Sequence, residues 1–243
     1  MIVIPMVGKS SRFFQAGYTR PKYELMVHGR SVFAHAVASF EAYFDSEFFL
    51  FLVRGDFGAE AFVRQELASL GVRRFELVVF EQETAGQADT VYQGLQRMRG
   101  AGSGGALTIF NIDTFRPGFT MPALDCDGYL EVFEGEGEHW SFVRPGADGR
   151  VLETTEKVRI SNLCSDGLYQ FRERSLFEQA FRHAASNDLR VRAEFYIAPL
   201  YNYLIAAGRD IRYVTVGAGE IVFCGTPDEY LAAVKHGNTS HAN

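Results

Sequence analysis

Residues 48–53 read FFLFLV, six consecutive apolar residues with no polar residue among them. A strand with one solvated face alternates apolar and polar side chains, so an unbroken apolar run of this length is typical of a strand covered on both faces. Such strands occur mainly in parallel sheets with helices on either side. The stretch therefore predicts an α/β fold.

Strands and helices alternate outward from this run. Further strands are expected over 2–6, 75–80 and 106–110. The segments between the strands have helical spacing, with Ser31 and Asp56 as expected N-caps and Gly71 as a stop. One helix carries an apolar stripe made of Phe33, Val37, Phe40 and Phe44, and the third helix is expected over 88–98. The resulting order, β-α-β-α-β-α-β, predicts a right-handed parallel sheet covered by helices.

The second half of the chain is less regular, and antiparallel additions to the sheet are expected there. Short strands are expected over 129–133, 141–144, 151–155, 167–171 and 211–216, and helices over 176–184 and 194–207. Thr226-Pro227-Asp228-Glu229 is a capping box with proline in the first turn, which predicts a C-terminal helix. No linker separates the halves, so one domain over residues 1–243 is expected.

Composition excludes several classes of protein. The chain has 243 residues, of which 22 are Phe and 11 are Tyr, which is enough apolar area to exclude disorder. Its formal net charge of −6 argues against nonspecific nucleic-acid binding, and its longest apolar run is far shorter than the roughly 18 residues of a membrane span. The three unpaired cysteines and the absence of a signal-peptide pattern favour a cytoplasmic protein. A homo-oligomer stays open.

The loop after the first strand reads VGKSSRF over residues 7–13. It is not a P-loop, because that motif requires a glycine five residues before Gly8, and Val3 occupies this position. It also lacks the glycines of a dinucleotide fingerprint. Its backbone amides can converge on phosphate oxygens, with Arg12 and Lys22 as nearby cations. Taken together, these polar residues favour an anion-binding loop over an ordinary turn.

Two further loops follow predicted strands. Asp113 comes after the fourth strand, where a carboxylate points into the ligand crevice of an open sheet and can hold Mg²⁺. Gly86 lies in the loop 82–90, where it would let the backbone approach a flat base. Taken alone, each feature is better explained as an ordinary turn or loop.

Together these elements resemble the family of nucleotidyltransferases that activate sugar phosphates with nucleoside triphosphates. The family's signature loop is similar to residues 8–13 followed by Pro21-Lys22, and its nucleotide-base loop is similar to 84–90. The resemblance continues through Glu156-Lys157, 167–171, Arg192-Ala193-Glu194 and Gly225-Thr226-Pro227, and so spans nearly the full chain. It implies a single Rossmann-like domain of the nucleotide-diphospho-sugar transferase type, with a nucleotide-binding half (1–115) and an acceptor-binding half (116–243).

The resemblance also implies roles for individual residues. Asp113 would hold Mg²⁺, Arg12 and the loop amides would neutralise the leaving pyrophosphate, and Lys22 would lie near the α-phosphate. Lys157 would grip the acceptor phosphate, and Glu156 would contact the body of the acceptor. The remaining implied contacts are Met6, Val7, Gly8, Lys9, Ser10, Ser11, Gln82 and Gly86 for the nucleotide, and Arg192 and Glu194 for the acceptor.

The sequence departs from the family pattern at two positions. Ser10 replaces the middle glycine of the signature loop, and Phe223 stands where many members carry a second metal-binding aspartate. Glu220 is the substitute carboxylate that the sequence suggests. The variant pattern is most similar to the members found in capsule and surface-polysaccharide gene clusters. Some of those use CTP, and some activate acceptors that are not sugars, such as phosphocholine.

We therefore expect a Mg²⁺-dependent transfer of a nucleotidyl group, with CTP, UTP or dTTP as the donor and a phosphorylated small molecule as the acceptor. Two alternatives stay open. A glycosyltransferase of a related fold usually carries Asp-x-Asp where this chain has Asn111-Ile112-Asp113. A catalytically silent relative that binds nucleotide sugars would be consistent with Phe223.

Overall fold

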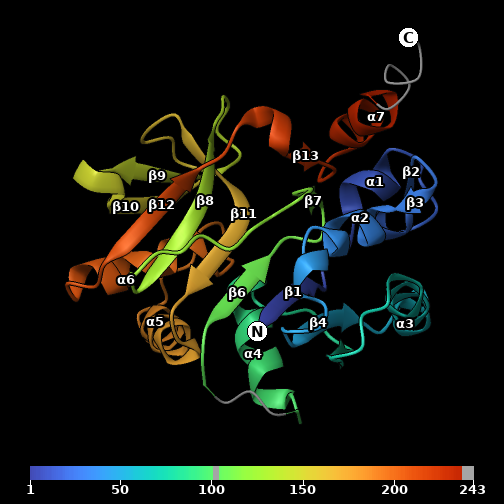
Figure 1. Cartoon of the computed structure of the whole chain (residues 1–243), viewed down its shortest axis with the longest axis horizontal. Helices are drawn as coiled ribbons and strands as arrows, with labels where there is room; N and C mark the ends of the chain where they lie inside the picture. Colours follow the sequence, from blue (N-terminus) through green and yellow to red (C-terminus); the bar gives the residue numbers. More distant parts are fainter. Residues whose placement is uncertain (101–103, 237–243) are drawn as a thin grey trace.

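The structure is a computed structural model that describes residues 1–100 and 104–236. Its central feature is a nine-stranded sheet with the order β10-β9-β11-β6-β1-β4-β5, in which β8 pairs with β11 and β12 pairs with β8 (Figure 1). The strands are β1 (Ile2–Met6), β4 (Phe49–Arg54), β5 (Phe75–Phe80), β6 (Leu107–Phe110), β8 (Gly128–Glu134), β9 (Ser141–Pro145), β10 (Val151–Glu156), β11 (Leu163–Phe171) and β12 (Ile211–Thr215). Two small sheets pair β2 (Met26–Val27) with β3 (Arg30–Ser31), and β7 (Thr114–Phe115) with β13 (Val222–Phe223).

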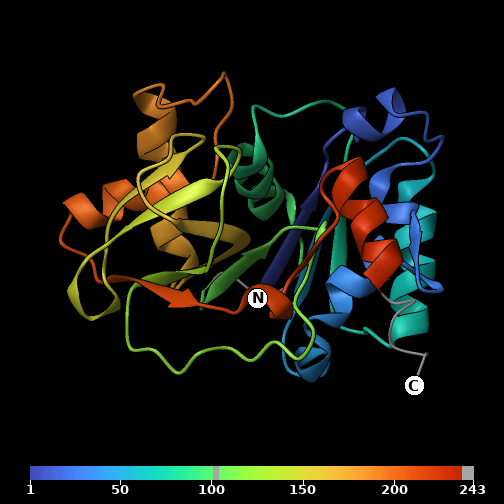
Figure 2. The ribbon, with the colours of Figure 1, turned by 90° about the horizontal axis from the view of Figure 1, so that it is seen from above.

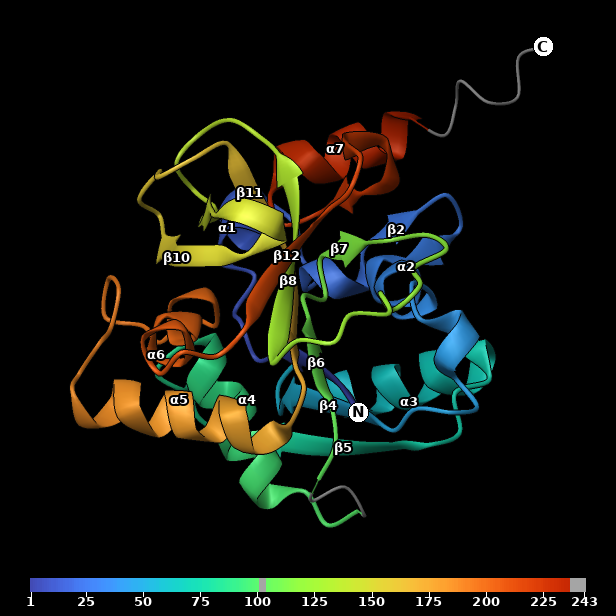
Figure 3. The same ribbon diagram turned by 60° about the vertical axis from the view of Figure 1, so that its left-hand side comes forward.

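The first half of the chain forms a parallel core, as the sequence predicts. Strands β5, β4, β1 and β6 are neighbours, and every pairing among them is parallel. Strand β11 adds to β6 in the antiparallel direction, and β8 and β9 pair antiparallel with β11. Strand β12 lies parallel beside β8 (Figure 3). The mixed α/β fold with antiparallel additions is therefore confirmed.

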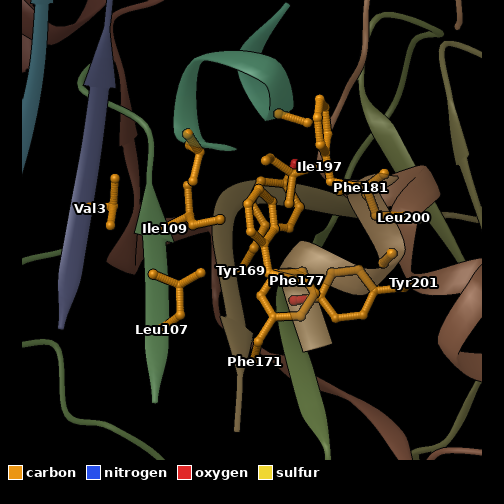
Figure 4. Packing of buried hydrophobic residues seen from close by; sticks show 14 of the residues in the cluster. Val3, Leu107, Ile109, Tyr169, Phe171, Phe177, Phe181, Ile197, Leu200 and Tyr201 are labelled. Carbon is orange, nitrogen blue, oxygen red and sulfur yellow. The ribbon is translucent and has the colours of Figure 1, made fainter. Parts of the chain in front are cut away.

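Two apolar clusters cover the opposite faces of the sheet. In β1, Ile2 and Ile4 belong to one cluster and Val3 to the other, which is the period-2 alternation of a strand buried on both sides. Helices α2 (Val32–Ala38), α3 (Ala59–Leu70) and α7 (Pro227–His236) pack on the first face. Helices α4 (Gln87–Arg97), α5 (Arg174–Ser186) and α6 (Tyr201–Ala206) pack on the second, whose aromatic core is seen in Figure 4.

Two predicted helix caps are confirmed. The Ser31 hydroxyl accepts a hydrogen bond from the Ala34 backbone N–H at 2.9 Å at the start of α2. At the start of α7, the Thr226 N–H donates to Glu229 Oε2 at 2.9 Å and the Glu229 N–H donates to Thr226 Oγ1 at 3.3 Å, which completes the capping box. The apolar stripe predicted after Ser31 extends beyond the end of its helix. Helix α2 ends at Ala38, and a 3-10 turn follows over Glu41–Tyr43.

Two other helix predictions are wrong. The cap at Asp56 fails because α3 begins only after Gly58, which has a left-handed backbone, and the Asp56 carboxylate pairs with Arg54 instead. The helix predicted over 194–207 is helical only from Ala198 onward. Upstream of that, Phe195 N–H donates to the Ala85 carbonyl at 2.7 Å and the Ala88 N–H donates to the Phe195 carbonyl at 2.9 Å. These pairings use backbone groups that a helix through Phe195 would need. Pro199 has no N–H and is tolerated only in the first turn of a helix, so it also favours a helix that starts close to it.

Helix α7 returns to the elements of the first half, as Figure 2 shows for the red helix. The Tyr230 hydroxyl donates to the Met26 carbonyl at 3.0 Å, and a His28 ring nitrogen lies 2.9 Å from the Ala233 carbonyl. The division of the chain at residue 115 stays a prediction, but the end of the second half packs on the first. Within the described residues, no helix is both long enough and apolar enough to cross a membrane.

Candidate active site

Two clefts open where the strands of the parallel core end. The first cleft, of about 450 Å³, is lined by the loop after β1, the loop after β5 and the residues that follow β6. The second cleft, of about 260 Å³, lies toward the antiparallel part of the sheet. Four residues line both clefts, namely Lys22, Gln87, Asn111 and Asp113. Because the carboxyl edge of a parallel sheet is where open α/β folds bind ligands, the two clefts form one candidate site.

The loop after β1 forms one part of the first cleft. Met6, Val7, Gly8, Lys9 and Ser11 line it, and a short helix, α1 (Ser11–Gln15), follows immediately. This helix was not predicted from the sequence. Ser10 has a left-handed backbone with φ of 53°, so it takes the conformation for which the family uses glycine.

The Ser10 side chain also has a local role. Its hydroxyl accepts a hydrogen bond at 3.1 Å from the backbone N–H of Lys22. The serine therefore ties the loop after β1 to the turn that carries Lys22. Ser10 itself is not among the residues that line either cleft.

Lys22 and Asp113 form an ion pair at the junction of the two clefts. The Lys22 ammonium lies 2.5 Å from Asp113 Oδ2, and about a fifth of each side chain is exposed. Lys22 begins a 3-10 turn after Pro21, and Asp113 follows β6, so residues 91 positions apart meet here. The sequence predicted both residues for the site, and the structure brings them together.

Arg54 and Glu83 are site residues that the sequence analysis missed. Both line the first cleft, where Glu83 pairs with Lys9 and lies 3.8 Å from Arg54 Nη1. Arg54 Nη1 is buried and has no hydrogen-bond partner within the described part of the chain. A buried guanidinium nitrogen without a partner is ready to bind an anion or a carbonyl oxygen. No local motif marks an arginine at the end of a strand.

The loop 82–90 contributes differently from the prediction. Gly86 lines the first cleft with φ of 115°, and a Cβ on it would lie 2.6 Å from the Phe195 nitrogen. The close approach that requires glycine is therefore to the chain's own segment around Phe195. Gln82 is exposed and lies outside both clefts, whereas Glu83 and Thr84 line the first.

Buried polar groups line the inner part of the second cleft. Glu156 lies there 6% exposed and accepts a hydrogen bond from the Ser141 hydroxyl, which is also 3.3 Å from the Tyr169 hydroxyl. Burial raises the pKa of the Glu156 carboxyl, although the hydrogen bond from Ser141 and the charge of Lys157 oppose this shift. Lys157 Nζ lies 3.7 Å from Glu156 Oε1 and 4.2 Å from the centre of the Tyr196 ring.

The other site residues that the resemblance implied are dispersed. Arg12, implied for the leaving pyrophosphate, lines the second cleft from α1 and does not line the first cleft. Glu194 lines the first cleft rather than the second. Arg192 is exposed and outside both clefts, in a turn where Arg192 and Ala193 have left-handed backbones. The structure thus gathers Arg12, Lys22, Asp113 and Glu156 around the second cleft, and leaves Lys157 and Arg192 outside the lining of both clefts.

An aromatic wall, defined here as Trp140 and Phe223, forms one side of the second cleft. Their ring centres are 4.8 Å apart, and Phe133 packs behind both at 5.1 Å. Phe223 stands where, by the resemblance, many members of the family carry a second aspartate. The replacement therefore does more than remove a charge, because it extends an apolar surface into the cleft.

Glu220 is directed away from the site, so the sequence's suggestion of a substitute carboxylate there is wrong. Its carboxylate accepts a hydrogen bond from the Gly217 N–H at 2.8 Å and lies 3.9 Å from Arg116. Glu229 lines the second cleft instead. Burial, followed by the charges of Asp113 and Glu229, raises the pKa of the Cys224 thiol to about 12. Both carboxylates therefore act on the same small region of the site.

A buried charge network supports the wall of the second cleft from behind. Arg116 pairs with Glu131, and Arg116 Nε lies 4.0 Å from Asp166 Oδ2. The Asp166 side chain is fully buried, which with the neighbouring charge of Glu131 raises its pKa well above the usual value. The Asp166 carbonyl accepts a hydrogen bond from Thr114 Oγ1 at 2.9 Å, so the network is tied to the segment that follows Asp113.

The donor set at the junction suits Mg²⁺. No group of three or more His, Cys, Asp or Glu side chains is gathered for a metal among residues 1–100 and 104–236. Mg²⁺ is usually held by one or two carboxylates together with substrate phosphates, and does not need an all-protein cage. Asp113, beside a cleft lined by backbone and cations, fits that description.

The cysteines take no part in a disulfide. Cys126, Cys164 and Cys224 are all free and buried, in agreement with their unpaired spacing in the sequence.

Comparison with known proteins shows a strong similarity to a solved structure. The sequence matches no model of a protein family and no curated protein. Among solved structures, the nucleoside-diphosphate-sugar pyrophosphorylase from Vibrio cholerae RC9 is 47% identical, covers 97% of this chain and 100% of its own, and has a TM-score of 0.93.

Two further solved structures share the fold. The inositol-1-phosphate CTP transferase from T. maritima is 12% identical, with 100% of this chain and 97% of that chain covered and a TM-score of 0.75. A UDP-glucose pyrophosphorylase complexed with UDP-glucose is 14% identical, with 99% and 98% covered and a TM-score of 0.73. At such low identity these two matches support the fold alone.

Proposed function

Because the chain belongs to the sugar-phosphate nucleotidyltransferase family, we propose that it transfers a nucleoside monophosphate from a nucleoside triphosphate to the phosphate of a small acceptor. An oxygen of the acceptor phosphate forms a bond to the α-phosphorus. The bond from the α-phosphorus to the bridging oxygen breaks, and pyrophosphate leaves with that electron pair. A phosphate dianion is already nucleophilic, so the reaction needs no Ser, Cys or His base.

The observation that carries this proposal is the junction of two clefts at one ion pair. A transfer between two phosphorylated molecules requires two binding spaces that meet where the phosphates react. The first and second clefts share Lys22, Gln87, Asn111 and Asp113, and the Lys22–Asp113 pair lies at that junction. The reacting phosphates are therefore proposed to meet beside Lys22.

The first cleft is assigned to the nucleotide. The loop after β1 is proposed to offer its backbone amides to phosphate oxygens, and Arg54 Nη1 is a buried donor that has no hydrogen-bond partner in the described chain. Glu83, Thr84 and Gly86 line the part formed by the loop after β5, which is where the base is proposed to lie. CTP, UTP and dTTP are all compatible with this assignment.

The second cleft is assigned to the acceptor. Arg12 and Lys22 line it, so two cations are available for the acceptor phosphate. Lys157 does not line the cleft, but its Nζ lies 3.7 Å from Glu156, which does. Glu156 and Ser141 offer hydrogen-bonding partners for hydroxyl or amino groups. The aromatic wall suits an acceptor with an apolar face, which sugar rings and N-methyl groups both provide. A sugar 1-phosphate and a non-sugar capsule precursor are both included.

Mg²⁺ is proposed as the cofactor, with Asp113 as its protein ligand. When bound, the ion would neutralise charge on the triphosphate. Lys22 adds a fixed positive charge at the same point, and the amides of residues 8–11 hold the phosphates in place. These groups are held by the fold before the substrates meet, so they need not reorganise as charge shifts to the leaving pyrophosphate.

The test is a grid of pyrophosphate-release assays in Mg²⁺. CTP, UTP, dTTP, GTP and ATP are each combined with sugar 1-phosphates, phosphocholine, glycerol phosphate and phosphorylated amino acids. We expect one pair to release pyrophosphate and form a nucleoside-diphosphate product. Release of a nucleoside diphosphate from a nucleotide sugar would instead identify a glycosyltransferase. Nucleotide binding without turnover for any pair would identify a silent relative.

A further inference from the structure

We propose that Glu229 acts with Asp113 as the second carboxylate of the metal site, in place of the aspartate that Phe223 has replaced. The inference rests on the proposed function and adds a residue to it. Asp113 follows β6, and Glu229 lies in the first turn of α7, so the two come from distant parts of the chain. Both line the second cleft.

The two carboxylates approach the same point of the backbone, which is possible because residue 225 is glycine. A Cβ at that position would lie 2.8 Å from Asp113 Oδ2 and 3.3 Å from Glu229 Oε2. Both oxygens therefore face the same small volume. Any larger residue would place its side chain against both carboxylates, whereas glycine lets both approach the same point of the backbone.

The charges at this volume favour a cation. Two carboxylates face one ammonium, that of Lys22, which already lies 2.5 Å from Asp113 Oδ2. These three groups sum to one negative charge, in a partly buried position where screening by water is reduced. Arg12 lines the same cleft, but within the described residues it forms no ion pair with either carboxylate. A divalent ion with substrate phosphates would relieve the repulsion between the two carboxylates.

Glu229 is held in place by its own helix. Its Oε2 accepts a hydrogen bond from the Thr226 N–H at 2.9 Å, as part of the capping box. An ionised carboxylate has about four lone-pair sites, so the cap leaves acceptor capacity for a metal. The same contact fixes the direction of the side chain. Without it, the glutamate side chain would rotate freely.

The experiment measures metal binding directly and does not depend on turnover. Mn²⁺ binding is followed by electron paramagnetic resonance, with the metal alone and with pyrophosphate, a ligand that does not depend on the nucleotide base. The variant is Glu229→Gln, because glutamine can keep the capping hydrogen bond and removes only the charge. We expect Mn²⁺ affinity to fall by about 10- to 100-fold, with an unchanged melting temperature.

Two further variants make the result interpretable. Glu220→Gln removes a carboxylate from the same C-terminal region, but one that is directed toward Arg116, so this variant should bind Mn²⁺ as the wild type does. Asp113→Asn should lose binding. If Glu229→Gln keeps wild-type Mn²⁺ affinity while Asp113→Asn loses it, Glu229 is a helix cap alone and the inference is overturned.

The inference and the proposed function fail in different ways. A wild-type enzyme that releases pyrophosphate in the substrate grid, with Mn²⁺ affinity unchanged in Glu229→Gln, keeps the function and loses the inference. A wild-type protein that turns over no pair loses the function. If Mn²⁺ affinity is unchanged in both Glu229→Gln and Asp113→Asn, the metal lies elsewhere, and the inference fails with the metal assignment.

Discussion

At the scale of single residues, the Lys22–Asp113 pair is the point on which the proposed chemistry depends. Replacing Lys22 with alanine should lower the rate of pyrophosphate release by about 10²–10³-fold, because a positioned charge at the reacting phosphate is lost. The control is Lys235→Ala, since Lys235 is exposed and lines neither cleft, so its loss should leave the rate close to that of the wild type. Both variants should keep the wild-type circular dichroism spectrum. Near-wild-type turnover in Lys22→Ala would remove Lys22 from the mechanism.

At the scale of elements, the site depends on how closely the loop after β5 packs against the segment around Phe195. Gly86→Ala should destabilise the fold by about 2–5 kcal/mol, because its Cβ would meet the Phe195 backbone and its φ is positive. Gly208→Ala is the matched control, with a positive φ but nothing within 4 Å, and should cost about 1–2 kcal/mol. Urea unfolding gives both free energies. An equal loss in the free energy of unfolding for both variants would show that the loop moves to accommodate the methyl group.

At the scale of the whole molecule, the buried Asp166 links stability to pH. Its pKa is raised in the folded state, so folding favours the protonated form, and this stabilisation is present in full only below the usual value near 3.8. It is lost as pH rises through the folded pKa. The melting temperature of Asp166→Asn should therefore fall less than that of the wild type as pH increases above about 4. Parallel curves for variant and wild type would place the pH dependence in another group.

Local sequence was sufficient for much of the fold. The apolar run at 48–53 forms the predicted strand, and the Thr226–Glu229 capping box starts the predicted C-terminal helix. Both predictions succeed because burial on two faces and a first-turn cap each require particular residue types at consecutive positions. Lys22 and Asp113 were found by motif. Where prediction failed, at Asp56 and over 194–207, a contact with a distant segment or a left-handed residue overrode the local pattern.

What the tertiary structure alone decided is which groups meet. Arg54, Glu83 and Glu229 carry no motif that marks them as site residues, and each reaches a cleft only because strand order and the return of α7 place it there. The space above Gly225 likewise exists only between two elements far apart in sequence, the end of β6 and the start of α7. Sequence patterns record each residue's local backbone and burial. Distances between side chains on different elements depend on packing, which no single segment encodes.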